Sequence, residues 1–532
     1  MKGQKDSDLS QNEWIQVWLS RLSAETQLLN FSGPVDFNEF GKSLASLSVE
    51  DPERFKEFSV DLLPRALKAL SDNDSDDSSW APVFDKMGIL FPEFKDFNRP
   101  HALWLIRQVQ ASKELITKLH LIIESGDMNI EQGLENWRCD IFNGAILPDT
   151  IRPDIFCLGQ NIAATSGDVV FENQLFQLVQ YHSATKTVHE NPVLLIPAFV
   201  NRFYILDLSD ECSMVKWLVD QGHTVFLISW VNPSELLGNY DMTHYMLDGA
   251  LAALDCVCRM LPSCKPQVVG YCAGGVVSAI LAAWLKARGE DRISSLSLLT
   301  TLLDYRDSGP LGELVSKESI ESIRKPLNDL GYLPPELLLR IFASLRPQDL
   351  IFERMLNSYI LGQRARPYPL LHWLGDGTRI PASLVLWTLE KLYFENVLVK
   401  ETPFELAGQR IQLSTIDCPV FLFAAERDDI SPWQGVMHAA DQFGSTPMCV
   451  LGEGGHNVGV VNPPSKPRYN HLVLNTDNLM DKQLAEFRSG SWWMTWKDFL
   501  MDKAGASIFP PKTGGGFRAA IEEAPGRYVQ IR

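Results

Sequence analysis

Basic residues and long apolar runs are scarce in this chain of 532 residues. Lys and Arg total 48 against 66 Asp and Glu, which gives a formal net charge of −18. Because binding to nucleic acids depends on clustered Lys and Arg, we expect no nucleic-acid partner. No apolar run reaches the ~18 residues that span a bilayer, and the start, MKGQKDSDLSQNEW, lacks the apolar stretch of a secretory signal. The sequence therefore predicts a cytoplasmic protein that is not integral to a membrane.

Paired metal-ligand cysteines are also absent. The nine cysteines are an odd number, and none of them shows C-x₂-C spacing. This pattern argues against a disulfide framework and against a metal site. The Gly-rich segment KTGGGF lacks the G-K-[ST] ending of a phosphate-binding loop. We therefore expect reduced thiols, no bound metal and no resident cofactor.

The chain has two regions that differ in their sequence patterns. Residues 1–150 contain helical patterns and no convincing strand, and the acidic, Ser-rich segment 71–79 interrupts them. From about residue 160, short apolar runs such as PVLLIPAF, HTVFLISW, PQVVGY, SLSLLTTLL, CPVFLFAA and MCVLG alternate with helical segments. That alternation is typical of a sheet covered by helices on both faces. The sequence predicts a mainly helical N-terminal domain over residues 1–150 and an α/β domain over residues 151–532.

A long insertion separates the SLSLLTTLL and CPVFLFAA runs. Residues from about 305 to 415 are dense in helical patterns and aromatic side chains. Ligand sites of open α/β sheets lie at the carboxyl ends of the strands, and an insertion after such an end commonly covers the site. We expect these residues to form a helical cap, or lid.

The segment GYCAGG places a cysteine between a strand pattern and a helical pattern. This is the context of the nucleophile elbow in the α/β-hydrolase fold, a sharp turn between strand and helix that needs small neighbours. The pattern predicts Cys272 as the nucleophile. The backbone N–H of Ala273, together with one from the loop after PVLLIP near Phe199 or Val200, would face the oxyanion that develops during acyl transfer.

Two polar residues complete the pattern in the order nucleophile, acid, histidine that this fold requires. Asp428 follows the CPVFLFAA run, and His456 follows the MCVLG run within a Gly-rich loop. Asp429 is the alternative acid, and an Asp after a strand is often only a helix N-cap. His223 precedes its strand and would lie at the opposite edge of the sheet. The sequence thus predicts Asp428 and His456 as the partners of Cys272.

A thiol at the elbow favours one kind of chemistry. A base-activated cysteine attacks an acyl carbonyl and holds the acyl group as a thioester until a second nucleophile takes it. If the incoming substrate is itself a thioester, exchange onto Cys272 is nearly thermoneutral. Acyl transfer fits this arrangement better than one-way hydrolysis does.

Several long segments in the right order resemble the polyhydroxyalkanoate synthases. The similar segments span about residues 120–532 and include IPAFVNRFYILDLSDECSMVKWLVDQGHTVFLISWVNPS, GYCAGG, LLTTLLDYRDSG, FLFAAERDDISPW, GEGGHNVGVVNPPSKP, GSWWMTWKDFL and APGRYVQIR. The resemblance implies a cytoplasmic acyltransferase that polymerises (R)-3-hydroxyacyl-CoA into polyester and releases coenzyme A. The family's nucleophile, acid and histidine correspond to Cys272, Asp428 and His456, and the aspartate of its L-L-D-[FY] motif corresponds to Asp304.

The resemblance also implies partners and a place in the cell. Members of the family act as dimers at the surface of storage granules, and the segment from Tyr204 to Trp230 is closest to single-subunit members that prefer short-chain monomers, as in poly-3-hydroxybutyrate biosynthesis. Two alternatives stay open. A polyester depolymerase or acyl-CoA thioesterase would use the same triad with water as acceptor, and a weakly active homologue would act as a scaffold on granules.

Overall fold

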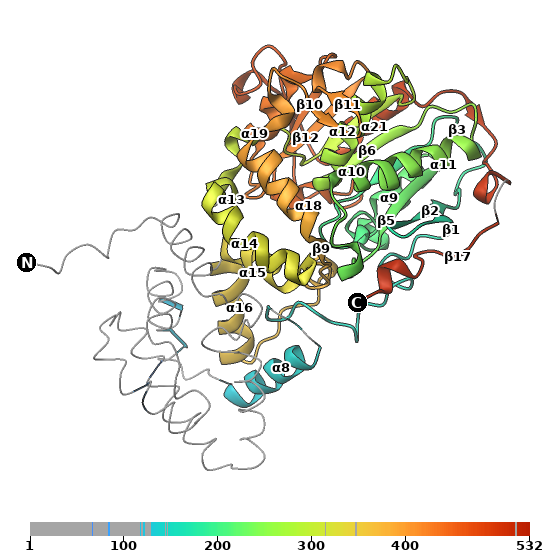
Figure 1. The fold of residues 1–532 in the computed structure, drawn as a ribbon. Coiled ribbons are helices and arrows are strands. Elements are labelled where there is room, and N and C mark those ends of the chain that lie inside the picture. Colours follow the sequence, from blue (N-terminus) through green and yellow to red (C-terminus); the bar gives the residue numbers. More distant parts are fainter. Residues whose placement is uncertain are drawn as a thin grey trace, which may run out of the picture. The chain divides into compact units, whose positions relative to one another are not determined.

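A computed structural model describes most of the chain from residue 129 onward (Figure 1). The described residues are 129–143, 145, 147–313, 315–345, 348–516 and 519–532, with isolated positions at 66, 83, 85, 117, 118, 121 and 122. Most of the predicted helical domain over residues 1–150, including the acidic segment 71–79, lies outside them.

The described residues form two compact units. The first contains Phe156–Pro335 and Asp376–Arg532, and the second contains Glu336–Gly375 with described residues that precede Phe156. Part of the predicted insertion at 305–415 therefore belongs to each unit. The boundary after residue 150 and the lid role of the insertion stay predictions.

One large sheet forms the frame of the first unit. Within the described residues it has 11 strands. The strands are β1 (Gly167–Glu172), β2 (Phe176–Tyr181), β4 (Val193–Ile196), β5 (Val225–Trp230), β6 (Gln267–Tyr271), β7 (Ser295–Leu299), β12 (Val420–Ala425), β13 (Met448–Gly452), β14 (His471–Val473), β15 (Glu486–Arg488) and β17 (Glu522–Glu523). Each apolar run quoted above from PVLLIPAF to MCVLG contains one of them, so those strand predictions are confirmed.

The order of the strands fixes where a site can form. Across the sheet the order is β15-β14-β13-β12-β7-β6-β4-β5-β2-β1-β17. The pairs from β5 through β4, β6, β7 and β12 to β13 are parallel, whereas β2 runs antiparallel to β5. The chain passes from β4 to β5 on one side and then returns to β6 on the other side, which makes the carboxyl ends of β4 and β6 a topological switch point. This order of strands, with β2 antiparallel, confirms the α/β-hydrolase fold.

The central strands of this sheet are buried, and three pairs of short strands lie outside it. The residues of β4, β5, β6, β7 and β12 are buried throughout, as expected for central strands covered on both faces. Pairs of short strands lie outside the large sheet: β3 (Val188–His189) with β16 (Ser507–Ile508), β8 (Tyr332–Leu333) with β9 (Ile380–Pro381), and β10 (Phe404–Leu406) with β11 (Gln409–Ile411).

Helices fill the connections between the strands. They are α8 (Ile130–Phe142), α9 (Met214–Asp220), α10 (Met242–His244), α11 (Ala252–Met260), α12 (Ala273–Ala287), α13 (Gly309–Glu313), α14 (Lys317–Leu330), α15 (Pro335–Leu345), α16 (Glu353–Met355), α17 (Pro369–Gly375), α18 (Ala382–Trp387), α19 (Trp433–His438), α20 (His456–Val460) and α21 (Trp493–Asp502). Helix α12 is apolar on all sides and buried from Gly274 to Leu285, so it lies in the core beside β6. No helix in the described part of the chain is both long and apolar enough to cross a membrane.

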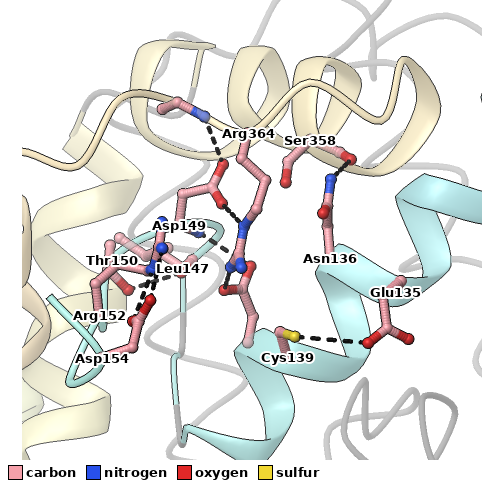
Figure 2. A network of polar contacts seen from close by, with 12 residues as sticks. Glu135, Asn136, Cys139, Leu147, Asp149, Thr150, Arg152, Asp154, Ser358 and Arg364 are labelled. Atoms are coloured by element: carbon pink, nitrogen blue, oxygen red, sulfur yellow. Dashed lines mark hydrogen bonds and ion pairs between the residues drawn. The ribbon is translucent and has the colours of Figure 1, made fainter.

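A half-buried arginine organises the second unit (Figure 2). Arg364 donates from Nε to Asp149 Oδ1 over 2.6 Å and pairs through Nη2 with Asp140. Asp140 also accepts from the backbone N–H of Asp149 and from the hydroxyl of Tyr359, at 3.0 and 3.1 Å. One guanidinium thus neutralises two buried carboxylates, because its fork of N–H groups reaches both.

A fully buried arginine joins distant segments of the first unit. Arg202 donates to the carbonyl oxygens of Val529 and Ile531 at 2.5 and 3.0 Å. Its Nε lies 2.9 Å from Asp376 Oδ1, and the side chains of both residues are almost fully buried. The loop that follows β4 is thereby fixed to residues more than three hundred positions later in the chain.

Candidate active site

Cys272 lies on a sharp turn at the carboxyl end of β6 and directly before α12. Its backbone angles are φ 51° and ψ −122°, a conformation that residues other than glycine rarely adopt. The turn is held by two hydrogen bonds, one from the N–H of Cys272 to Leu299 O and one from the N–H of Gly275 to Cys272 O, both 2.9 Å long. The structure thus forms the predicted sharp turn between strand and helix, with the thiol half-buried. The role of Cys272 as the nucleophile stays a prediction.

Close backbone packing explains the glycines of this turn. A Cβ atom on Gly274 would lie 2.1 Å from Ile196 O, and one on Gly275 would lie 1.9 Å from Thr301 Oγ1. No side chain fits at such distances. The first turn of α12 therefore packs directly on the carboxyl ends of β4 and β7, which brings Cys272 to the switch point of the sheet.

The predicted acid follows β12 and is fully buried. Asp428 Oδ1 accepts from the backbone N–H groups of Ile430 and Ser431, each at 2.8 Å. Its other oxygen, Oδ2, lies 2.7 Å from Nδ1 of His456. Asp429 is exposed. The geometry therefore selects Asp428 as the partner of the histidine and not its neighbour.

His456 is the first residue of α20 and is buried. Burial by itself would lower the pKa of His456, but the charge of the Asp428 carboxylate, followed by that of Cys272, raises the pKa well above its usual value. Since Nδ1 faces Asp428, Nε2 is the ring nitrogen that remains for Cys272. The structure thus brings the three residues predicted from the sequence together at the carboxyl ends of β6, β12 and β13. His223, the histidine that the sequence disfavoured, is buried ahead of β5.

Three tyrosines lie near enough to Cys272 for its charge to affect them. Tyr271 precedes Cys272, and its ring lies 5.8 Å from the ring of His456. Tyr305 and Tyr393 pack edge to face with 4.7 Å between ring centroids. Burial is the main cause that raises the pKa of each phenol, and a negative charge on Cys272 adds to it. All three phenols therefore stay protonated at neutral pH and are neutral neighbours of the thiol.

The residues predicted to face an oxyanion lie at the same edge of the sheet. Ala273 is the first residue of α12, where a helix leaves its N–H without an intrahelical acceptor. Phe199 and Val200 lie in the loop after β4, where Phe199 packs edge to face on Tyr245 at 5.1 Å. The direction of their N–H groups toward a substrate stays a prediction.

Asp304, the aspartate of the L-L-D-[FY] motif, stabilises a loop beside the site. It accepts from Arg306 Nε at 2.8 Å and from Asn396 Nδ2 at 3.0 Å, and Asn396 Oδ1 accepts from the N–H of Tyr305. Burial would raise the pKa of Asp304, but the hydrogen bonds from Arg306 and Asn396 lower it below its usual value. No sequence pattern pointed to Asn396, whose left-handed backbone (φ 50°) suits an asparagine.

Metal ligands do not gather in the part of the chain that the structure describes. No group of three or more His, Cys, Asp or Glu side chains there is arranged to hold a metal ion. The side chains of Trp492, Trp493 and Trp496 are buried in the core.

Solved structures that resemble this chain carry the names of hydrolases. The monoacylglycerol lipase of Paleococcus ferrophilus is 14% identical, with a TM-score of 0.34 over 53% of this chain and 90% of that chain. The α/β hydrolase domain-containing protein 10 from mouse is 16% identical, with a TM-score of 0.29 over 55% of this chain and 92% of that chain.

The sequence itself matches polymerases. Residues 109–218 match the family model described as the N-terminus of poly-beta-hydroxybutyrate polymerase (PhaC). The poly(3-hydroxyalkanoate) polymerase subunit PhaC of Cupriavidus necator is 36% identical over 422 residues, which cover 77% of this chain and 71% of that protein. The subunit of the same name from Rhizobium meliloti is 34% identical over 471 residues, which cover 86% of this chain and 76% of that protein. The chain therefore belongs to the poly(3-hydroxyalkanoate) polymerase family.

Proposed function

We propose that this protein is an acyltransferase that polymerises (R)-3-hydroxyacyl-CoA into polyhydroxyalkanoate through a thioester on Cys272. The favoured monomer is short, such as 3-hydroxybutyryl-CoA, because the segment from Tyr204 to Trp230 resembles the members that use short monomers. Coenzyme A enters as part of the substrate, and the chemistry needs no resident cofactor or metal.

In the first half-reaction the thiol takes the acyl group. His456 accepts the proton of Cys272, and the sulfur attacks the carbonyl carbon of the acyl-CoA thioester. The oxyanion of the tetrahedral intermediate would accept from the N–H of Ala273 and from Phe199 or Val200, each donor contributing about 3 kcal/mol to lowering the barrier. The carbon–sulfur bond to coenzyme A breaks, and the leaving thiolate receives the proton from His456.

In the second half-reaction a hydroxyl takes the acyl group from the enzyme. The 3-hydroxyl of an acyl unit attacks the thioester on Cys272, an ester bond forms, and the Cys272 sulfur leaves as a thiolate. His456 removes the hydroxyl proton, and the Asp428 carboxylate stabilises the imidazolium that results. Repetition of these two steps lengthens the polyester by one unit for each coenzyme A released.

The contact between the buried side chains of Asp428 and His456, beside the turn that carries Cys272, is the observation that carries this proposal. The 2.7 Å contact orients the ring so that one nitrogen is left for the thiol. The turn conformation of Cys272 presents its side chain at the switch point of the sheet, where ligands of α/β proteins bind.

The partners of the reaction follow from the same proposal. The growing polyester makes the protein act at the surface of storage granules in the cytoplasm, and the resemblance to the family favours a homodimer. Co-sedimentation of the protein with polyester granules and its mass in solution by light scattering test these two points.

The decisive experiment measures coenzyme A release from (R)-3-hydroxybutyryl-CoA and analyses the acyl product. Wild-type protein is expected to release coenzyme A and to form polymer, whereas Cys272→Ala is expected to do neither while remaining folded. Cys212→Ala, which removes another half-buried thiol, serves as the matched control. Free 3-hydroxybutyrate as the product would identify a hydrolase instead. Granule binding without any release, also with longer acyl chains, would identify a scaffold.

A further inference from the structure

Helix α20, which begins with His456, is too short to be stable by itself. It has five residues, and isolated helices shorter than about 12 residues are marginal in water. The carbonyl oxygens at its C-terminal end also need hydrogen-bond donors from outside the helix. What holds this end of α20 therefore determines where the imidazole of His456 lies.

Two buried indoles supply those hydrogen bonds. Trp492 Nε1 donates to Gly459 O, and Trp493 Nε1 donates to Val460 O, each at 2.9 Å. Both tryptophans are buried, and Val460 O also accepts from the N–H of Asn462 at 3.0 Å. Trp492 is thus the donor on which the end of α20 depends more strongly.

Trp492 also contacts the strand that leads to the acid. Its ring stacks on Phe423 of β12 with 4.1 Å between centroids, and on Phe421 with 6.1 Å. The same side chain therefore fixes the end of α20 relative to the strand that precedes Asp428. Because His456 and Asp428 must meet at 2.7 Å, a side chain that holds both elements determines the geometry of the pair.

We propose that Trp492, supported by Trp493, is a positioning residue that holds α20 so that His456 faces both Asp428 and Cys272. This inference rests on the proposed role of His456 as the base. The indole N–H groups donate to backbone carbonyl oxygens of α20, so their effect would reach the reaction through the position of the imidazole.

Trp496 provides a matched control on the same helix. Its indole is fully buried and donates to Ser297 Oγ in β7 over 2.9 Å. Replacement of Trp496 therefore removes a hydrogen bond of the same length as those of Trp492 and Trp493. The variants Trp492→Phe, Trp493→Phe and Trp496→Phe keep an aromatic ring and remove one N–H each. They differ in whether the lost bond ends on α20.

The experiment measures kcat and KM for coenzyme A release, and the rate at which iodoacetamide alkylates Cys272 as a function of pH. Mass spectrometry of the peptide that contains Cys272 separates this thiol from the others. We expect Trp492→Phe to lower kcat about 10-fold with KM almost unchanged, because a displaced base costs rate and not binding. The pH profile of alkylation should shift in Trp492→Phe, shift less in Trp493→Phe and stay at the wild-type position in Trp496→Phe.

Equal behaviour of Trp492→Phe and Trp496→Phe in both measurements, at equal folded fractions, would overturn the proposal. If Trp492→Phe does not fold, 3-benzothienylalanine at position 492 replaces the N–H by sulfur in a ring of nearly the same shape. If wild-type protein releases no coenzyme A, the proposed function fails, whereas the alkylation profiles still test the positioning role.

Discussion

The hydroxyl of Tyr271 donates to Asn457 Oδ1 over 2.5 Å, and this bond joins the residue before Cys272 to the residue after His456. The two residues are 186 positions apart in the sequence. The elbow and the first turn of α20 are thus tied by a hydrogen bond that belongs to neither the thiol nor the imidazole.

Removal of this hydroxyl tests how firmly the pair must be held. Tyr271→Phe keeps the ring beside His456 and removes the bond to Asn457, so we expect coenzyme A release to fall by about 5-fold, the worth of one hydrogen bond. Tyr240→Phe, which removes a hydroxyl bond to Gln174 at 3.1 Å on the surface, should keep wild-type activity. Steady-state rates of both variants at one pH decide the matter, and equal rates would contradict the expectation.

The protonation of His456 should depend on both of its neighbours. Asp428 and Cys272 raise the pKa of His456, so Asp428→Asn and Cys272→Ala should each bring it down. Titration of ¹³C-labelled histidine by NMR, with His456→Gln to assign the signal, measures both shifts. If the pKa of His456 is unchanged in Asp428→Asn, the charge of Asp428 does not raise it across the 2.7 Å contact.

The raised pKa of His456 also makes the stability of the fold depend on pH. A histidine with a pKa higher in the folded than in the unfolded state stabilises the fold below the unfolded value of about 6.5, and that contribution is lost as pH rises through the folded value. Urea unfolding of wild type and Asp428→Asn at pH 6 and pH 9 should therefore differ more at the lower pH.

His223 should act in the opposite direction. Burial, followed by the charges of His189 and Lys497, lowers its pKa to about 3, and neither ring nitrogen has a hydrogen-bond partner within the described residues. Between pH 6.5 and 3 the unfolded chain binds a proton that the folded chain does not, so stability falls as pH falls. At pH 5 this amounts to about 2 kcal/mol.

Replacement of His223 tests this directly. His223→Leu should unfold with a smaller difference in free energy between pH 7 and pH 5 than wild type, whereas His182→Gln, at an exposed site, should retain the wild-type difference. Urea unfolding followed by tryptophan fluorescence gives the values. A His223→Leu protein with the wild-type pH dependence would exclude His223 as its source.

The second unit should depend on one guanidinium. Arg364→Met leaves the buried carboxylates of Asp140 and Asp149 without their cation, at a cost of about 3 kcal/mol. Arg138→Met removes an exposed pair with Glu135 at 3.8 Å and should cost less than about 0.5 kcal/mol. Hydrogen exchange of α8 compares the two variants, and equal protection in both would refute the role of Arg364.

The strands and the three residues of the candidate site could be predicted because both leave local patterns. Central strands buried on both faces are continuous apolar runs, and Cys272, Asp428 and His456 each directly follow a run or the loop after it. Strand ends were harder to place. The run SLSLLTTLL ends as a strand at Leu299 because Thr300 has a positive φ of 44°, which no composition indicates.

Side chains that hold the site left no such pattern. Three hydrogen bonds join residues far apart in the sequence: Tyr271 to Asn457, Asn396 to Asp304, and Trp492 to Gly459. In its own segment, each of these residues looks like an ordinary polar or core residue. Nor did periodicity indicate that residues 336–375 pack with the segment before Phe156. Such pairings become visible only when the sheet order is known.

The bonds from Arg202 to Val529 and Ile531 impose an order on how the site is completed. A ribosome makes residues 199–202, which include the predicted oxyanion loop, long before it makes residues 529–531. Until then the buried guanidinium lacks two of its acceptors, so the loop after β4 reaches its final arrangement late. A nascent or truncated chain that ends before Val529 would contain Cys272, Asp428 and His456 and still lack a finished site.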